Sequence, residues 1–299
     1  MVYKRYNPQQ YDEFVGQTDI IKELVVQTNA SKIKNKALEH ILLYGAPGLG
    51  KSTLARIIAK ERGTNLMEVT GTSISSISQL EWRLFSLKEQ DVLFIDEIHN
   101  LPTKLCELLY TPLESFVYND IPVFPFTLIA ATNYAGQIDK PLRDRITHKF
   151  IVEDYTEEEI CQVLRLNGAP PEIAKVISER SRGTPRVARD LLRKIDNRRI
   201  HMGNNALTLQ NCLDEFDSLG IDPIGLTSKD TEFLAYLKDN GAFDISRAIG
   251  EKTLCISLDI DKYDLTVLME PYLLRKGLIQ RTSRGRVLTR EGIQYLTRR

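Results

Sequence analysis

The stretch Gly45-Ala-Pro-Gly-Leu-Gly-Lys51-Ser52 decides the fold of the first half of the chain. It fits the pattern G-x-x-x-x-G-K-[ST], in which glycines let successive backbone N–H groups face phosphate oxygens. The apolar run Ile41–Tyr44 comes before it and the helix-forming run Thr53–Glu61 after it, which is the context that the pattern requires. A glycine-rich turn before a helix is the alternative. The predicted ATP-binding residues of this loop are Gly45, Gly48, Gly50, Lys51, Ser52 and Thr53.

Within this loop, Lys51 is expected to reach the β- and γ-phosphates, and the Ser52 hydroxyl is expected to bind Mg²⁺. Outside it, four more short, β-rich apolar runs alternate with helix-like segments. Such nearly continuous runs are typical of strands buried on both faces of a parallel sheet. The pattern predicts an α/β P-loop domain over residues 1–153. The four runs are Leu66–Thr70, Val92–Ile95, Phe126–Ala130 and Lys149–Val152.

Two acids, Asp96 and Glu97, end the apolar run that starts at Val92. A buried parallel strand delivers its last residues to the edge where ligands bind. We therefore predict that Asp96 holds the magnesium shell and that Glu97 polarises the attacking water. The alternative is a pair of acids that opens a solvated helix. The box Asp96–His99 also resembles that of DExH helicases, but the other motifs of those helicases are missing, so we interpret the likeness as shared P-loop chemistry.

Residues 154–222 are predicted to form a small all-α domain. Thr156 and Glu159 make a capping box that opens a helix. Only helices are expected from there to about Ser218, with breaks at Gly168–Pro171 and Gly183–Pro185. Asp222–Gly225 contains a proline and a glycine and is predicted to be a linker.

Residues 223–299 are predicted to be a winged helix, because three helices and a two-stranded ribbon follow one another. Pro271 is expected to kink the third helix, and the basic turn Thr282–Gly285 joins the strands. The expected elements are a helix from Thr227 or Ser228 to about Asn240, a short helix with Arg247, a helix over Asp261–Lys276, and strands Leu278–Arg281 and Arg286–Thr289.

Composition gives no global argument for nucleic-acid binding, since 40 basic residues balance 40 acidic ones. The end of the chain differs locally: Arg275–Arg299 holds eight basic residues and one acid. Within it, Arg281, Arg284 and Arg286 flank the predicted wing turn and are predicted to contact the DNA backbone without reading its sequence. A solvated basic tail is the alternative.

The cysteines and the hydropathy pattern bear on the cell compartment. The four cysteines contain no Cys-x-x-Cys pair, which predicts reduced thiols and no zinc site. No apolar run approaches the roughly 20 residues of a membrane span, and the polar start of the chain is unlike a signal peptide. A cytoplasmic protein without a membrane partner is expected.

Motif strings along nearly the whole chain resemble the AAA+ ATPases and, within them, the RuvB family of Holliday junction branch migration motors. The last two strings are the most specific to that family. They are Asp12–Gln17, Leu38–Gly45, Asp91–His99, Pro141–Arg145, Arg180–Arg186, Glu270–Gly277 and Arg281–Arg286.

The resemblance implies a hexameric ring that uses ATP and Mg²⁺ to move double-stranded DNA, with branch migration of four-way junctions in recombination and repair as its function. It implies that Asn133 is the sensor 1 residue, that Arg145 is an arginine finger acting on the neighbouring subunit's ATP, and that Arg186 is the sensor 2 residue. A core or hinge role remains open for Tyr155. The other nucleotide contacts that the resemblance implies are Val15, Gly16, Glu114, Ser115, Phe116 and Tyr155.

The chain departs from the family pattern at two places. Asn7 stands where the family has an arginine near the nucleotide, and Arg5 is a candidate substitute. The segment between Phe116 and Phe126 is shorter than the β-hairpin with which the family docks RuvA, and its two prolines disfavour a long paired hairpin. A RuvA-like partner could bind differently, be replaced by another protein, or be absent.

Two other functions compete with the translocase. One is a non-motor ATP switch that binds DNA, like an origin-binding initiator, and the other is a clamp-loader subunit. Glu97 and Arg145 favour a motor, because they complete a set for efficient hydrolysis. The winged helix disfavours the clamp loader, and the strings Glu270–Gly277 and Arg281–Arg286 disfavour the switch.

Overall fold

The computed structural model describes residues 6–203 and 206–298 of the chain. Arg5, the candidate substitute for the missing arginine, lies outside the described residues. The chain forms two compact units. One contains residues 6–167 and 183–186, and the other contains residues 168–182 and the described residues from 187 onward. Among the described residues, none of the helices has the length and apolarity needed to cross a membrane.

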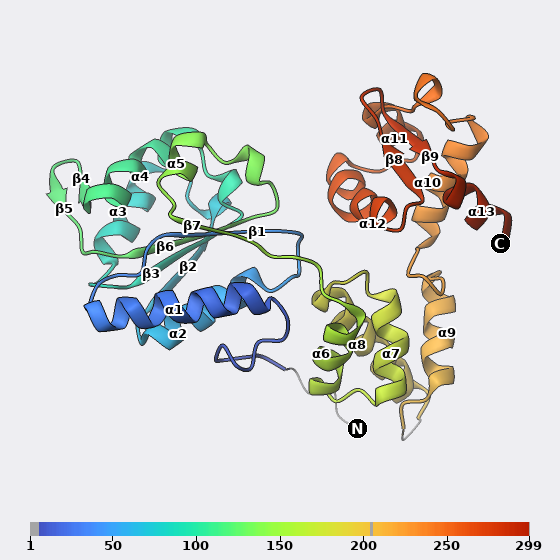
Figure 1. Cartoon of the computed structure of the whole chain (residues 1–299), viewed down its shortest axis with the longest axis horizontal. Coiled ribbons are helices and arrows are strands. Elements are labelled where there is room, and N and C mark those ends of the chain that lie inside the picture. Colours follow the sequence, from blue (N-terminus) through green and yellow to red (C-terminus); the bar gives the residue numbers. More distant parts are fainter. Residues whose placement is uncertain (1–5, 204–205, 299) are drawn as a thin grey trace. The chain divides into compact units, whose positions relative to one another are not determined.

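A five-stranded parallel sheet, in the order β2-β3-β6-β1-β7, is the centre of the first unit (Figure 1). The five strands confirm the predicted α/β pattern. Pairing extends β3 to Asp96, opposite Thr70, and β6 to Thr132, opposite Tyr44. The strands are β1 (Ile41–Tyr44), β2 (Leu66–Thr70), β3 (Val92–Asp96), β6 (Thr127–Thr132) and β7 (His148–Ile151).

Helices cover both faces of this sheet, with α1 and α2 on one side and α3, α4 and α5 on the other (Figure 1). On the second side, Leu80 of α3 and Leu109 of α4 pack in one core with Leu93 and Leu128 of the strands. Burial of apolar area on both faces explains why the strands read as unbroken apolar runs. The helices are α1 (Thr18–Lys34), α2 (Lys51–Arg62), α3 (Ile77–Ser86), α4 (Thr103–Ser115), α5 (Lys140–Asp144) and α6 (Glu157–Leu166).

The shortened segment after α4 forms a very small hairpin. Strands β4 (Val117–Tyr118) and β5 (Ile121–Pro122) pair through only two residues each. The turn residues Asn119 and Asp120 have φ angles of 47° and 64°, as in a type I′ turn. A long paired hairpin is therefore absent from this described segment, as its prolines predict.

The second unit starts with helices only: α7 (Pro171–Arg180), most of α8 (Pro185–His201) and α9 (Leu209–Leu219). This all-α character agrees with the predicted lid. The predicted capping box of Thr156 and Glu159 is present at the start of α6. Helix α6 belongs to the first unit, so the division between the units falls inside the predicted segment 154–222.

The winged helix follows and differs from the prediction at its second helix, at its third helix and at its end. Arg247 lies in a 3₁₀ turn over Ile245–Arg247, and the second helix, α11, begins only at Glu251. Residues Asp264–Met269 form a π-helical turn before α12, and Pro271 lies in the first turn of α12. Proline has no N–H to donate, so the helix changes its hydrogen-bond register there. Helix α13 was not predicted. The elements are α10 (Ser228–Asp239), α11 (Glu251–Ser257), α12 (Glu270–Arg275), β8 (Ile279–Arg281), β9 (Arg286–Leu288) and α13 (Arg290–Arg298).

The wing is a tight ribbon fixed to the body of this domain. Ile249 pairs with Arg286 as an antiparallel bridge and extends the ribbon on one side. At Gly285, φ is 154°, and a Cβ atom would lie 2.3 Å from the Ile249 carbonyl oxygen. Only glycine fits this close approach.

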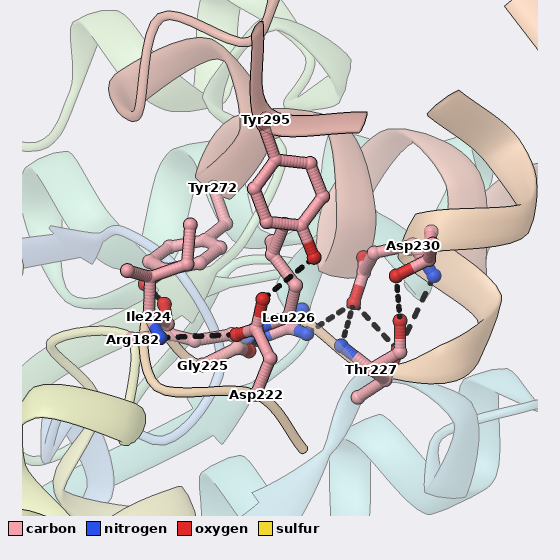
Figure 2. Close-up of polar contacts among 10 residues, drawn as sticks. Arg182, Asp222, Ile224, Gly225, Leu226, Thr227, Asp230, Tyr272 and Tyr295 are labelled. Carbon is pink, nitrogen blue, oxygen red and sulfur yellow. Dashed lines mark hydrogen bonds and ion pairs between the residues drawn. The ribbon is translucent and has the colours of Figure 1, made fainter. Parts of the chain in front are cut away.

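The predicted linker Asp222–Gly225 forms a hydrogen-bonded turn (Figure 2). Asp222 Oδ1 accepts hydrogen bonds from the backbone N–H groups of Leu226, at 2.7 Å, and Ile224, at 3.0 Å. Its Oδ2 accepts one from the Tyr295 hydroxyl at 2.6 Å. An aspartate that accepts hydrogen bonds from the backbone two and four residues further on caps its own turn.

Arg182 fastens this turn to the lid side of the second unit (Figure 2). Its Nε donates to the Gly225 carbonyl at 2.9 Å, and its guanidinium pairs with the buried Asp230. The same guanidinium lies 4.9 Å from the centre of the Tyr272 ring. Asp230 is buried, so loss of Arg182 would leave a buried carboxylate without this partner.

Candidate nucleotide-binding site

Lys51 is held inside the loop that follows β1. Its Nζ donates hydrogen bonds to the carbonyl oxygens of Gly45 at 2.7 Å and Ala46 at 2.9 Å, and to Asn133 Oδ1 at 3.3 Å. The residue is 6% exposed. Burial lowers the pKa of Lys51, against the opposing effect of the Glu97 and Asp96 carboxylates. Among the described residues Lys51 makes no ion pair, so this ammonium is poised to attract phosphate oxygens.

Ser52 and Asp96 meet at the mouth of the sheet. Ser52 Oγ donates a hydrogen bond to Asp96 Oδ2 at 3.0 Å. Mg²⁺ usually takes one or two protein oxygens and completes its shell with water and substrate phosphates. Nowhere in the described chain do three or more histidine, cysteine or acidic side chains gather to hold a metal alone. The hydroxyl and carboxylate therefore fit a Mg²⁺ that binds together with a nucleotide.

Glu97 and Asn133 lie beside this pair, because they follow the ends of the adjacent strands β3 and β6. Glu97 has a φ of 49° and starts a 3₁₀ turn over Ile98–Asn100. Asn133 contacts Lys51 through its Oδ1. The structure thus brings Lys51, Ser52, Asp96, Glu97 and Asn133 together at one edge of the sheet.

Gly48 marks the place where Arg186 approaches the loop. A Cβ atom on Gly48, whose φ is 87°, would lie 2.7 Å from Arg186 Cβ and 2.9 Å from Thr184 Cγ2. The positive charge of Arg186 also acts to lower the pKa of Lys51. Both the steric and the electrostatic relation place this arginine next to the phosphate-binding loop, where its sensor 2 role stays a prediction.

The segment with Val15 and Gly16 lies at the other side of the loop. Tyr155 is buried, and its hydroxyl donates to the Leu49 carbonyl at 3.2 Å. A Cβ on Gly16 would lie 3.0 Å from Tyr155 Cε1, and one on Gly50 would lie 3.0 Å from Phe14 Cζ. These contacts bring the predicted residues Val15, Gly16 and Tyr155 to the loop. Phe14 joins them without having been predicted.

Arg145 and Glu114 form a separate group. Arg145 ends α5, and its Nε lies 3.1 Å from Glu114 Oε1 near the end of α4. Its Nη1 donates to the Pro141 carbonyl at 3.0 Å, and its guanidinium lies 4.4 Å from the centre of the Tyr110 ring. The predicted residues Glu114, Ser115 and Phe116 therefore share this location with Arg145, and not with the loop after β1. Thr53, in contrast, lies in the first turn of α2.

The three arginines predicted to bind DNA divide into two kinds. Arg281 and Arg284 are exposed around the wing turn. Arg286 is 4% exposed, and it hydrogen-bonds to both carboxylate oxygens of Glu270, with Nη2 3.1 Å from Oε2. This placement corrects the predicted DNA contact at Arg286, because a buried arginine paired with a buried glutamate holds the fold together. In sequence, position in a basic cluster gave no sign of this burial.

Two further residues, His99 and Gln17, lie at the site, and neither was assigned a role from the sequence. His99 Nδ1 lies 2.9 Å from Thr132 Oγ1 and 3.2 Å from Glu97 Oε2. Gln17 makes a two-way contact with Glu153, since its Nε2 donates to the carbonyl at 2.7 Å and its Oε1 accepts from the N–H at 3.1 Å. In the sequence, His99 could be noticed as the fourth residue of the box Asp96–His99. Gln17 lies in a quoted string, but spacing alone does not reveal its backbone partner.

The sheet order, the loop after β1 and the acidic end of β3 define a P-loop ATPase of the AAA+ type. Models of three domains match the chain in sequence: the Holliday junction DNA helicase RuvB P-loop domain over residues 6–151, the RuvB AAA lid domain over 158–222, and the RuvB C-terminal winged helix domain over 223–297. The chain belongs to the RuvB family.

Relatives and solved structures agree over nearly the full length. The Holliday junction branch migration complex subunit RuvB of Kosmotoga olearia is 37% identical, and the match covers 97% of this chain and 89% of that protein. The namesake from the Wolbachia of Brugia malayi is also 37% identical over 97% of this chain and 93% of its own. The Thermotoga maritima RuvB Holliday junction branch migration motor is 35% identical, with a TM-score of 0.88 over 97% of this chain and 98% of that one.

Proposed function

We propose that this protein is an ATP-driven DNA translocase that acts as a hexameric ring in the cytoplasm and migrates the branches of Holliday junctions during recombination and repair. The observation that carries the proposal is the convergence of Lys51, Ser52, Asp96, Glu97 and Asn133 at one edge of the sheet in a chain of the RuvB family. The relatives are named as branch migration subunits, which favours the motor over a non-motor ATP switch.

Each residue of the site has a distinct part in phosphoryl transfer. Lys51 binds the β- and γ-phosphate oxygens, and Asn133 orients both Lys51 and the attacking water. Glu97 polarises that water. Ser52 and Asp96 would hold Mg²⁺, which would supply positive charge at the phosphates. Hydrolysis here depends on positioning and charge and requires no covalent intermediate with the protein.

Arg145 acts on the nucleotide of a neighbouring subunit. Its contacts with Glu114, Pro141 and Tyr110 lie on α4 and α5 and not on the phosphate-binding loop, which supports a role in trans. A guanidinium supplied in this way stabilises the charge that develops on the transferred phosphoryl group. Efficient hydrolysis then requires assembly of the ring.

Arg281 and Arg284 contact duplex DNA from the wing. They are exposed on either side of Ser283, and Arg281 ends β8. Arginines that bind phosphates fix the orientation of a protein on DNA without selecting a sequence. This property suits a motor that must pass over any sequence.

The decisive test is ATP hydrolysis with and without duplex DNA, for the wild type and for Arg145→Ala. We expect DNA to stimulate the wild type, and we expect the variant to lose roughly 10³- to 10⁵-fold in kcat. Because the finger acts in trans, mixing in the variant should suppress wild-type activity. Slow hydrolysis at a rate that DNA does not change, together with ATP-dependent DNA binding, would instead establish a non-motor ATP switch.

A RuvA-like junction-binding partner belongs to the proposal, and the hairpin of β4 and β5 is its docking element. The exposed Ile121, at 53% of its surface, gives the hairpin tip an apolar contact. Deletion of Asn119–Val123, or the milder Ile121→Asp, is expected to weaken co-elution with RuvA while DNA-free hydrolysis stays unchanged. A stoichiometric complex that survives both changes would refute a docking role for this hairpin.

A further inference from the structure

The carboxylate of Glu97 has one oxygen whose surroundings are incomplete. Glu97 Oε2 is shielded from solvent, and no described residue donates a hydrogen bond to it. A buried carboxylate oxygen without a donor costs free energy. His99 Nδ1 lies 3.2 Å from this oxygen, because the left-handed backbone at Glu97 and the 3₁₀ turn after it bring the imidazole back alongside.

The imidazole of His99 is itself fixed from the opposite side. Its Nδ1 lies 2.9 Å from Thr132 Oγ1, and its ring meets the Tyr134 ring edge-on at 5.1 Å between centroids. Only 10% of its side chain is exposed. Thr132 Oγ1 also accepts the Tyr134 N–H at 2.9 Å. The ring therefore has little freedom to turn away from Glu97.

These distances favour one assignment of the hydrogen on the His99 ring. A lone pair on Nδ1 would face the charged Glu97 oxygen at 3.2 Å, which is repulsive. A hydrogen on Nδ1 instead is directed at the Thr132 oxygen at 2.9 Å, and the Glu97 oxygen at 3.2 Å attracts it electrostatically. The hydrogen is therefore assigned to Nδ1, with the Thr132 hydroxyl as its acceptor.

Thr132 gives this arrangement a connection to the rest of the site. It is the last residue of β6, directly before Asn133, which contacts Lys51. His99 thus connects Glu97, which follows the end of β3, with Thr132 at the end of β6. We propose that His99 is a positioning residue for Glu97. The Nδ1–H of His99, held by Thr132, sets the position of the Glu97 carboxylate that polarises the water. This inference rests on the proposed function, because the water-polarising role of Glu97 is part of that proposal.

The test compares substitutions that keep or remove the donor, with DNA-stimulated ATP hydrolysis as the measurement. His99→Leu should lower kcat by roughly 10- to 100-fold, as loss of an orienting partner typically does. KM for ATP should stay near the wild-type value, since Lys51 and the loop still bind the phosphates. His99→Asn places an amide N–H near the position of Nδ1 and should recover most of kcat. Thr132→Val should lower kcat, and Thr132→Ser should preserve it.

A matched control and a stability measurement exclude a purely structural effect. His148 on β7 also lies beside a glutamate, with its Nε2 3.4 Å from Glu39 Oε2, and His148→Leu should leave kcat unchanged. Unfolding temperatures are recorded for every variant. The inference is overturned if His99→Leu keeps the wild-type kcat, or if His99→Asn loses as much as His99→Leu while both remain equally stable.

Glu97→Gln separates this inference from the function on which it rests. If Glu97→Gln is inactive and His99→Leu is normal, only the role of His99 fails. If Glu97→Gln hydrolyses ATP at the wild-type rate, the role assigned to Glu97 fails and the inference fails with it. If Glu97→Gln and His99→Leu both lose activity and His99→Asn recovers it, the roles assigned to Glu97 and to His99 are both supported.

Discussion

Lys51 in the phosphate-binding loop and Arg286 in the wing are both cationic and both almost fully buried, at 6% and 4% exposure, yet their surroundings differ. Arg286 is surrounded by carboxylates, with Glu270 bonded to its guanidinium and Glu251 at 3.5 Å. Lys51 has two carbonyl oxygens and an amide oxygen as its acceptors. Arg286 is bonded to a carboxylate of its own domain, whereas Lys51 makes no ion pair among the described residues and feels the Asp96 and Glu97 carboxylates only at a distance.

The difference separates a structural cation from a binding one. A buried charge that is paired with an equally buried partner satisfies its own electrostatic demand, and removal of either partner leaves the other unpaired. A buried charge that has only neutral acceptors destabilises the empty fold and gains most when an anion arrives. Burial and charge alone therefore do not identify a binding residue, and the distinguishing feature is a buried cation with no carboxylate bonded to it.

The strongest test of this contrast is Arg286→Met. The change leaves Glu270, itself 2% exposed, as an unpaired buried carboxylate. We expect the free energy of opening of the wing to fall by about 3–5 kcal/mol. Hydrogen exchange of the backbone amides of β8 and β9 measures this locally.

The control for Arg286 is the double substitution Arg286→Met with Glu270→Met. Replacing a buried ion pair by apolar side chains of similar volume is often neutral for stability, so the wing should recover its protection. If the single variant is as stable as the wild type, Arg286 is not structural, and the predicted DNA contact returns as its explanation.

Lys51→Met should have the opposite effects, a large loss of ATP hydrolysis without a loss of stability. ATP hydrolysis should fall by roughly 10²- to 10³-fold or more, because a charge that stabilises the phosphoryl group is lost. Burial lowers the pKa of Lys51, which means that its charged form is less favourable in the folded than in the unfolded chain. The unfolding temperature without nucleotide should therefore stay the same or rise. A marked decrease would contradict the contrast.

The exposed wing arginines should give the smallest effects. Arg281→Ala and Arg284→Ala should each weaken duplex binding similarly for all sequences and reduce the slope of log affinity against log salt by about 1. Arg290→Ala, an exposed arginine at the start of α13, is the control and should change the slope less. Binding is measured at several salt concentrations. Equal slopes for all three variants would show that general charge, and not the wing, carries the contact.

Local sequence was sufficient where chemistry and backbone geometry come from the same short segment. The loop Gly45–Ser52 contains its own glycines, lysine and hydroxyl, and the strand that precedes it fixes where it lies. Asp96 and Glu97 were predictable for a related reason, since parallel strands end at a common edge. The wing strands were also predicted, with small differences at their ends.

Local sequence was insufficient where a side chain finds its partner far along the chain. Arg286 and Arg284 are two residues apart in one basic run, yet one bonds to Glu270 and the other is exposed. The link from His99 to Thr132 spans 33 positions. The contacts that Tyr295 and Arg182 make with the linker Asp222–Gly225 come from residues that are distant in sequence.

The sequence by itself determined the class of fold, the phosphate-binding loop, the acidic strand end and the likeness to RuvB. Only the tertiary structure decided which arginines of the wing are available to DNA, that Arg145 lies with Glu114 and not at the loop, and that His99 stands between Glu97 and Thr132. The physical reason is range. A strand or loop conformation is set by neighbours within a few residues, whereas the environment of a charge depends on every element that folds against it.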